Sequence, residues 1–440
     1  MYRNHRARFL ERLTREGAAA VIPTASPKTR NHDCEYRFRP DSDFWYLTGF
    51  AEPESVLVLL PGKDGGAGKS VLFLRERDKN LEIWNGRRLG VERAPDSLGV
   101  DCAFAIEDLW DELPSLLLGC ERIVYRTGVD AENDRQMIDT INTLRGRARG
   151  GVRPPIETID HVPYLHELRL YKDADEQTNM RRAAAITEEA HKRAMAETAP
   201  GVYENEIDAL IEYTFKRRGS TGPAYTNIVA GGVNACILHY NENDAELKDG
   251  DLLLIDAGAE LDYYASDVTR TFPVNGSFST EQRAIYELVL ESQIAGVEHI
   301  KPGVSFLSIH DVATGVLIDG LIRLGLLKGT REEALESDSY QRFYMHKTGH
   351  WLGLDVHDCG YYAEDGDSRL LEPGMTLTVE PGLYIAEDEE TVDAKWRGIG
   401  VRIEDDILVT ETGNEDLTCA IPKEVDEVEA ACGANLAPVG

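Results

Sequence analysis

The stretch Gly250-Asp-Leu-Leu-Leu-Ile-Asp256-Ala-Gly258 recurs in altered form as Gly374-Met-Thr-Leu-Thr-Val-Glu380-Pro-Gly382. Each copy reads glycine, five strand-like residues, an acid, one further residue and a glycine. Helical sequence precedes both copies, and the two acids stand 124 residues apart. The repeat predicts a duplicated helix-and-strand unit with pseudo-two-fold symmetry, in which Asp256 and Glu380 face each other.

Two aspartates are candidates for a shared site at the first copy. An isolated aspartate at a strand end is most often a cap or turn residue, but the apolar run 252–255 predicts that Asp256 is partly buried and requires a cation. Asp267 follows in a β-rich segment, 261–272, joined to the first strand by a predicted turn around 258–260. Adjacent carboxylates repel each other unless a metal lies between them or one is protonated. Asp262 is a competing choice, nearer the turn and more solvated.

Two further acids lie in strands with period-2 patterns. Thr376 and Thr378 share a strand face that ends in Glu380, and apolar residues occupy the other face, so Glu380 points away from the core. In the segment 398–410, Arg402 and Glu404 alternate with apolar residues and therefore share a face. A surface strand with an i, i+2 salt bridge is the alternative interpretation of that second pattern.

The histidines are unevenly distributed. His346, His350 and His357 fall within twelve residues that also contain glycines, and His239 lies in Cys236-Ile-Leu-His-Tyr240. Any one of them could be an ordinary core or surface histidine, but three so close together indicate a site.

Four carboxylates and one histidine form a ligand set dominated by hard oxygen donors, without a thiolate. This set favours Mn²⁺, Fe²⁺, Co²⁺ or Zn²⁺ over a structural zinc site, and the four negative charges would balance two divalent cations. Two such metals can share bridging carboxylates and a bridging hydroxide that attacks a carbonyl group. The sequence therefore predicts metal-assisted hydrolysis.

The composition restricts the possible binding partners of the protein and its cellular compartment. Lys and Arg total 47 against 78 Asp and Glu, a net charge of −31. A chain this acidic, without a long basic run, is not expected to bind nucleic acid or a membrane surface. It has no apolar stretch long enough to span a bilayer. Its seven scattered cysteines indicate a reducing compartment, so we expect a cytoplasmic protein.

The pattern of elements predicts an α/β (α+β) fold in two parts. Short apolar runs at 55–60, 70–74 and 122–125 alternate with helix-like sequence, and the glycine- and proline-rich segment 145–155 interrupts this pattern. We predict an N-terminal α/β domain over 1–150, a linker over 151–175 and a catalytic domain over 176–440. In the latter, helices are expected over 203–218, from Ser279 or Thr280 onward, and over about 305–324.

Five motifs resemble the pita-bread metallopeptidases, family M24, in the same order: LLLIDAG, SDVTRTFPV, GHWLGLDVHD, TVEPGLY and VRIEDD. The resemblance implies a pita-bread catalytic domain and a metal-ligand set of Asp256, Asp267, His350, Glu380 and Glu404. It further implies two divalent metal ions, most readily Mn²⁺. Asp256 would hold one metal, His350 and Glu380 mainly the other, and Asp267 and Glu404 would bridge them.

The resemblance also implies roles for residues around the metals. Glu380 would accept the proton of the attacking water, and His239 and His357 would contact the scissile carbonyl and the developing oxyanion. Arg402 would orient the site carboxylates. His346 and Tyr384 are expected to be pocket residues that bind substrate.

The N-terminal segments 38–50 and 82–90 resemble the N-terminal domain of bacterial aminopeptidase P. The implied substrate is a peptide with proline in the second position, from which the first residue is released. A prolidase, which cleaves Xaa-Pro dipeptides, is the close alternative, and a metal-free binding protein with this fold is a more distant one. Family members are commonly dimers or tetramers assembled through the N-terminal domain, so a homodimer or homotetramer is expected.

Overall fold

The computed structural model describes residues 1–63 and 66–433, so the end of the predicted range 176–440 lies outside the described residues. The chain divides into two compact units, Met1–Arg169 and Leu170–Gly440. This division falls inside the segment 151–175 that we predicted as a linker. Much of that segment is regular structure, because it contains the strand β8 (Glu157–Ile159) and the helix α7 (Val162–Leu170).

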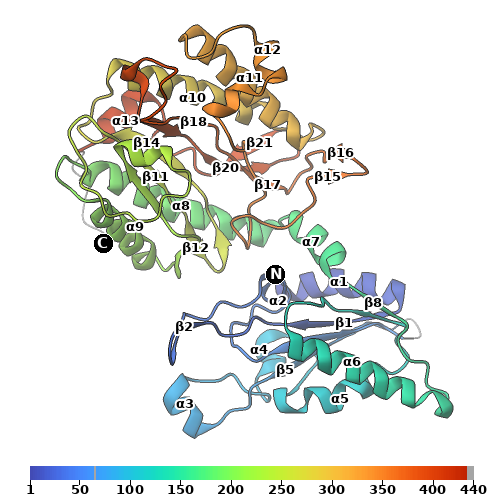
Figure 1. The fold of residues 1–440 in the computed structure, drawn as a ribbon. Helices are drawn as coiled ribbons and strands as arrows, with labels where there is room; N and C mark the ends of the chain where they lie inside the picture. Colours follow the sequence, from blue (N-terminus) through green and yellow to red (C-terminus); the bar gives the residue numbers. More distant parts are fainter. Residues whose placement is uncertain (64–65, 434–440) are drawn as a thin grey trace. The chain divides into compact units, whose positions relative to one another are not determined.

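The N-terminal unit is built on a six-stranded mixed sheet with the strand order β6-β5-β4-β1-β7-β8. Helix α1 lies on one face of this sheet and helices α5 and α6 on the other (Figure 1). The predicted strands at 55–60, 70–74 and 122–125 are confirmed as β4, β5 and β7. The strands are β1 Ala18–Pro23, β4 Val56–Leu60, β5 Lys69–Leu74, β6 Cys102–Ala105, β7 Arg122–Val124 and β8, with a separate hairpin of β2 Thr29–Asn31 and β3 Cys34–Glu35. The helices are α1 Tyr2–Glu16, α2 Ser42–Thr48, α3 Lys79–Asn85, α4 Ala94–Leu98, α5 Leu109–Leu116, α6 Ala131–Gly146 and α7.

The first half of the C-terminal unit consists of a helix pair followed by a three-stranded antiparallel sheet. Helices α8 and α9 pack against these strands and against a second small sheet, β13-β12-β9. The main sheet has the order β10-β11-β14, and β11 carries Asp256 at its end. The elements are α8 Ala174–Glu197, α9 Glu204–Arg217, β9 Gly222–Pro223, β10 Ile228–Gly231, β11 Leu252–Asp256, β12 Ala259–Leu261, β13 Tyr264–Ala265 and β14 Thr269–Pro273.

The second half repeats this plan. Helices α10 and α11 precede a three-stranded antiparallel sheet with the order β17-β20-β21, and the pair β18-β19 lies beside it. The α/β fold with an internal repeat is thus confirmed. The elements are α10 Thr280–His299, α11 Phe306–Arg323, α12 Arg331–Glu336, β15 Ala363–Glu364, β16 Asp367–Ser368, β17 Thr376–Val379, β18 Gly382–Ile385, β19 Ile399–Arg402, β20 Asp405–Val409, β21 Asn414–Asp416 and α13 Val425–Ala431.

The predicted helices begin and end close to where the sequence placed them. The Ser279 hydroxyl accepts from the backbone N–H of Gln282, and the Gln282 side chain accepts from the backbone N–H of Ser279, so this capping box starts α10 as predicted. Ser305 caps α11 by accepting from the backbone of Ser308. Among the described residues, no helix combines the length and the apolar character needed to cross a bilayer.

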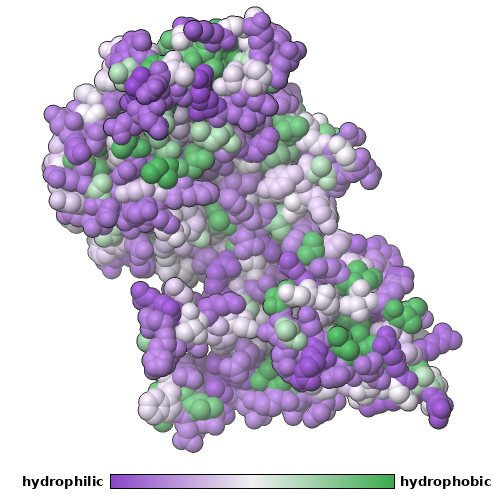
Figure 2. All heavy atoms as spheres, in the orientation of Figure 1, coloured by the Kyte–Doolittle hydropathy of each residue, from purple (hydrophilic) through white to green (hydrophobic). Residues whose placement is uncertain are grey.

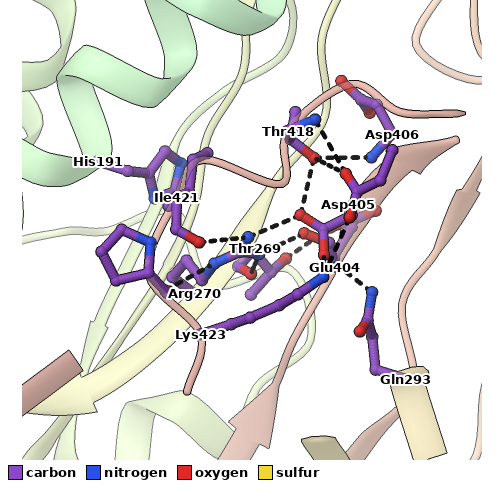
Figure 3. Close-up of polar contacts among 12 residues, drawn as sticks. His191, Thr269, Arg270, Gln293, Glu404, Asp405, Asp406, Thr418, Ile421 and Lys423 are labelled. Carbon is purple, nitrogen blue, oxygen red and sulfur yellow. Dashed lines mark hydrogen bonds and ion pairs between the residues drawn. The ribbon is translucent and has the colours of Figure 1, made fainter. Parts of the chain in front are cut away.

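A buried ion-pair network joins the two halves of the C-terminal unit (Figure 3). Arg270, on β14, donates to the carboxylate of Asp405 on β20 at 2.6 Å and to the backbone oxygen of Glu404 at 2.6 Å. Lys423 and Gln293 donate to the other oxygen of Asp405. Because β14 and β20 carry candidate ligands at or beside their ends, this network fixes the two halves of the candidate site against each other.

Candidate metal centre

Asp256 ends β11, and both of its carboxylate oxygens have donors. The hydroxyl of Tyr225 donates to Oδ1 at 2.5 Å, and Nη2 of Arg402 donates to Oδ2 at 2.6 Å. Burial raises the pKa of Asp256 in spite of Arg402, and the charge of Asp267 adds to this rise. The positive charge of Arg402 therefore does not fully compensate for the burial of this carboxylate.

Asp267 reaches the same place through the pairing of β11 with β14. The register places Asp256 opposite Thr269, so Asp267 lies just before the paired segment of β14. The backbone N–H of Asp267 donates to Asp406 at 3.1 Å. Burial alone would raise the pKa of Asp267, but the hydrogen bond and the charge of His350 lower it overall.

The connection between these two aspartates differs from our prediction. The prediction of a turn around 258–260 is wrong, because residues 259–261 form the strand β12. The chain reverses at Asp262 and Tyr263, which both have positive φ angles of 50° and 66°. At Gly258 the chain passes so close to Ser266 that a Cβ atom would lie 1.7 Å from its carbonyl oxygen. Asp262 is half exposed and pairs with Arg182, as expected for a solvated turn residue.

His350 faces two of the carboxylates through one ring nitrogen. Its Nδ1 lies 3.0 Å from the carbonyl oxygen of Trp351, which can only accept, so Nδ1 carries a proton. Its Nε2 lies 3.3 Å from Oδ2 of Asp267 and 3.7 Å from Oε1 of Glu380. Burial would lower the pKa of His350, but Asp267 and Glu380 raise it to about 9. Nε2 and these two carboxylate oxygens can lie this close together only if a proton or a metal cation lies between them.

Glu380 directly follows β17, and hydrogen bonds hold both its backbone and its side chain. Its N–H donates to the carbonyl oxygen of Thr348 at 2.7 Å, and the hydroxyl of Thr378 lies 3.4 Å from its Oε1. Burial raises the pKa of Glu380 to about 7, although His350 and Arg402 oppose the rise. The predicted alternation is confirmed, because Met375, Leu377 and Val379 lie in the hydrophobic core.

Glu404 and Arg402 meet at one threonine. The hydroxyl of Thr269 donates to Oε2 of Glu404 at 2.6 Å and lies 3.0 Å from Nε of Arg402, which donates to it. Burial and the charge of Asp267 raise the pKa of Glu404 well above its usual range. Arg402 is buried, so the alternative of a surface strand with a simple salt bridge does not hold.

The predicted residues come together around one cavity of about 530 Å³. Ligand atoms of Asp267, His350 and Glu404 lie within 4.8 Å of one another. The ring of His357 lies 4.1 Å from that of His350. The predicted site residues that line the cavity are Asp256, Asp267, His350, Glu380, Glu404, His239, His346, His357 and Arg402.

Tyr384 stands apart from this set. It is not among the residues that line the cavity, and its hydroxyl lies 2.9 Å from Nε2 of His346 and accepts from Nη1 of Arg402 at 2.9 Å. Burial lowers the pKa of His346 to about 4, and the charge of Arg402 contributes. Tyr384 therefore forms hydrogen bonds with two side chains of the cavity lining, although it is not itself part of that lining.

The charge balance of the site fits divalent cations. Two buried and two partly buried carboxylates converge on the cavity, and Arg402 is the one Lys or Arg that forms an ion pair with any of them among the described residues. Buried carboxylates in this number either take up protons or bind metal. Oxygen donors with one imidazole suit the harder divalent metals.

A second group of possible ligands, in the N-terminal unit, fits a different interpretation. Asp43 lies 2.8 Å from Nε2 of His161 and 3.3 Å from Nε2 of His166. Arg169 donates to its other oxygen at 2.8 Å and supplies a full positive charge. This carboxylate is thus paired without a metal.

Two contributors to the centre were missed by sequence reasoning. Thr269 stands two residues after Asp267 and shares its strand face, so the alternation of the strand could have identified it. Tyr225 lies in an irregular segment just before β10, and no pattern in the sequence distinguishes it.

Comparison with known proteins places the chain in a family. The family model described as metallopeptidase family M24 matches residues 178–411, and the model described as aminopeptidase P, N-terminal domain, matches residues 2–125. The chain belongs to metallopeptidase family M24. Membership of this family and the clustered ligand atoms together indicate a site for divalent metals.

Curated relatives and solved structures in the M24 family match almost the whole chain. An Xaa-Pro aminopeptidase of Escherichia coli K12 is 47% identical, covering 98% of this chain and 96% of the relative. One of Haemophilus influenzae is 46% identical, covering 96% of each. A Pseudomonas aeruginosa aminopeptidase structure gives a TM-score of 0.95 at 50% identity, covering 98% of this chain and 97% of its own. A zinc-substituted E. coli aminopeptidase P in complex with product gives 0.94 at 47% identity, with the same coverage.

Proposed function

We propose that this chain is a metallo-exopeptidase that releases the N-terminal residue from peptides with proline in the second position. The observation that carries the proposal is the geometry at His350, whose Nε2 faces carboxylates of Asp267 and Glu380 while its Nδ1 faces a backbone carbonyl oxygen. That arrangement needs a proton or a metal cation between these atoms, and the four carboxylates of the site favour the metal. Relatives at 46–47% identity over nearly the whole chain are named Xaa-Pro aminopeptidases, which supports the substrate class.

Five residues would hold the metals: Asp256, Asp267, His350, Glu380 and Glu404. Two divalent cations would offset the four carboxylates, and the hard oxygen donors favour Mn²⁺, with Zn²⁺, Co²⁺ or Fe²⁺ as alternatives. When bound, such cations polarise a carbonyl group and make water a nucleophile near neutral pH.

The protein's own side chains supply the remaining steps. Glu380 accepts the proton of the attacking water and passes it to the departing proline nitrogen. His239 and His357 line the cavity and donate to the carbonyl oxygen as negative charge develops on it. Arg402, with three partners in Asp256, Thr269 and Tyr384, orients the carboxylates. His346 contacts the substrate, and Tyr384 holds His346 in place.

The deciding experiment compares an Xaa-Pro dipeptide with an Xaa-Pro-Yaa tripeptide under added Mn²⁺. We expect release of the first residue, a faster reaction on the tripeptide, and loss of activity when a chelator removes the metal. Preference for the dipeptide would identify a prolidase. A protein that binds no metal and cleaves neither peptide would be a binding protein with this fold.

We further propose a cytoplasmic homo-oligomer. All seven cysteines are free, which suits a reducing compartment. On α3, Ile83 and Trp84 are 78% and 83% exposed, and Figure 2 shows hydrophobic atoms at the position of this helix. Apolar side chains so exposed favour a contact between copies of the N-terminal unit. Sedimentation of the purified protein measures the oligomeric state.

A further inference from the structure

One lysine at the catalytic cavity is not used by the proposed mechanism. Lys347 lines the cavity and lies between two other lining residues in the sequence, His346 and Gly349. Its side chain is exposed. It forms no ion pair and no side-chain hydrogen bond within residues 1–63 and 66–433. The other full cation of the cavity lining, Arg402, is buried and bound to Asp256. Lys347 therefore presents the one free positive charge among the described residues of the lining.

The cavity has opposite charges at its buried and exposed parts. The inner part holds the buried or partly buried carboxylates of Asp256, Asp267, Glu380 and Glu404, and the exposed Lys347 carries the opposite sign. A peptide cleaved at its first residue places its amino end among the buried groups. The rest of the peptide then extends toward the exposed part of the cavity, where a negative charge would meet Lys347.

We propose that Lys347 binds a carboxylate of the substrate and makes this enzyme prefer peptides with a negative charge beyond the proline. The carboxylate is either the C-terminus of a tripeptide or the side chain of an acidic residue after the proline. The inference rests on the proposed function, because it assigns a selectivity to that same reaction. An ammonium group on a flexible stem can reach either source.

The test uses the metal-loaded full chain and four peptides of one length. Two Xaa-Pro-Yaa tripeptides differ only in a free or an amidated C-terminus, and two amidated peptides carry Glu or Gln after the proline. We measure kcat/KM for the wild type, Lys347→Gln and Lys347→Arg. An exposed charge pair corresponds to a few-fold effect, so we expect the wild type to prefer the charged member of at least one pair by about threefold.

Lys347→Gln should abolish this preference mainly through KM, and Lys347→Arg should retain it. Raising the ionic strength should weaken the preference of the wild type. Lys328→Gln, an exposed lysine outside the cavity lining, is the matched control and should change nothing. Preference within the first pair identifies the C-terminus as the ligand, and preference within the second identifies the side chain.

Two failures are distinguishable. If the wild type cleaves all four peptides with equal kcat/KM within each pair, or if Lys347→Gln lowers all four equally, the role of Lys347 is refuted and the aminopeptidase activity stands. If the wild type releases no first residue from any of them, the proposed function itself is wrong.

Discussion

Thr269 donates a 2.6 Å hydrogen bond to Glu404 across the boundary between the two halves of the C-terminal unit. Thr269 begins β14 of the first half, and Glu404 lies between β19 and β20 of the second. The same hydroxyl accepts from Arg402, so one oxygen orients both a candidate ligand and the arginine that pairs with Asp256. The site therefore depends on the register of two strands that are distant in the sequence.

Replacing Thr269 by valine removes this hydroxyl at nearly constant volume. We expect metal affinity to fall about 10- to 100-fold, because groups that orient metal ligands have effects of this size. Titration of the metal-free protein with Mn²⁺ against a chromogenic chelator measures the change. Thr271→Val is the matched control, since within the described residues the Thr271 hydroxyl forms hydrogen bonds only with the backbone of Arg402. Equal losses in both variants would contradict the assigned role.

Glu380→Gln tests the proton acceptor. The amide keeps the size of the side chain but cannot accept the proton of water, so kcat should fall by about 10²- to 10⁴-fold. In the metal-free protein the thermal midpoint should not fall with it, because one of four mutually repelling carboxylates is removed. Steady-state hydrolysis and thermal unfolding measure the two effects, and Glu387→Gln, at an exposed position, is the control. Full activity in Glu380→Gln would assign the proton transfer to another group.

The candidate ligands could be predicted because each stands in a local pattern. Asp256 ends an apolar run, and Glu380 continues the polar face of its strand, so burial and direction follow from neighbouring residues. Their partners depend on tertiary register instead. Tyr225 reaches Asp256 from an irregular segment, and Tyr384 forms hydrogen bonds with His346 and Arg402 of the cavity lining. No spacing in the sequence encodes such contacts.

The wrong turn between Asp256 and Asp267 has a physical reason as well. Glycine is the usual residue at a left-handed position, so Gly258 marked the turn in the sequence. Gly258 instead permits the close approach to Ser266, and the turn uses Asp262 and Tyr263 with positive φ. The strand β8 within the predicted linker was missed for a similar reason, because this short strand has no alternation that identifies it and its neighbour β7 supplies the pairing.

Arg270→Met tests the network that joins the two halves. The substitution leaves the buried carboxylate of Asp405 without one of its two cations and removes donors from four backbone oxygens. Breaking a buried pair in this way costs about 3–5 kcal/mol of the free energy of unfolding. Urea denaturation measures it, with Arg283→Met at the exposed pair with Glu287 as a control that should cost less than about 1 kcal/mol. Similar costs for both variants would show that the network contributes little.

His191 gives the stability of the protein a defined dependence on pH. Its Nε2 donates to the carbonyl oxygen of Ala257 at 2.9 Å, and its Nδ1 is buried without a partner among the described residues. Burial lowers the pKa of His191 to about 4, and Arg270 contributes. Since an unfolded histidine titrates near pH 6.5, the unfolded chain binds the proton more readily. The contribution of His191 is therefore complete above pH 6.5 and is lost as the pH falls from 6.5 toward 4.

The loss from this residue amounts to about 2 kcal/mol between pH 8 and pH 5. In His191→Gln the amide can still donate to Ala257 but has no proton to gain. The variant should therefore be less stable than the wild type at pH 8 and should lose about 2 kcal/mol less on acidification to pH 5. Urea denaturation of both proteins at several pH values in this range measures the difference. The contributions of the carboxylates are the same in both proteins and cancel in the comparison. Parallel pH profiles for the two proteins would mean that folding does not lower the pKa of His191.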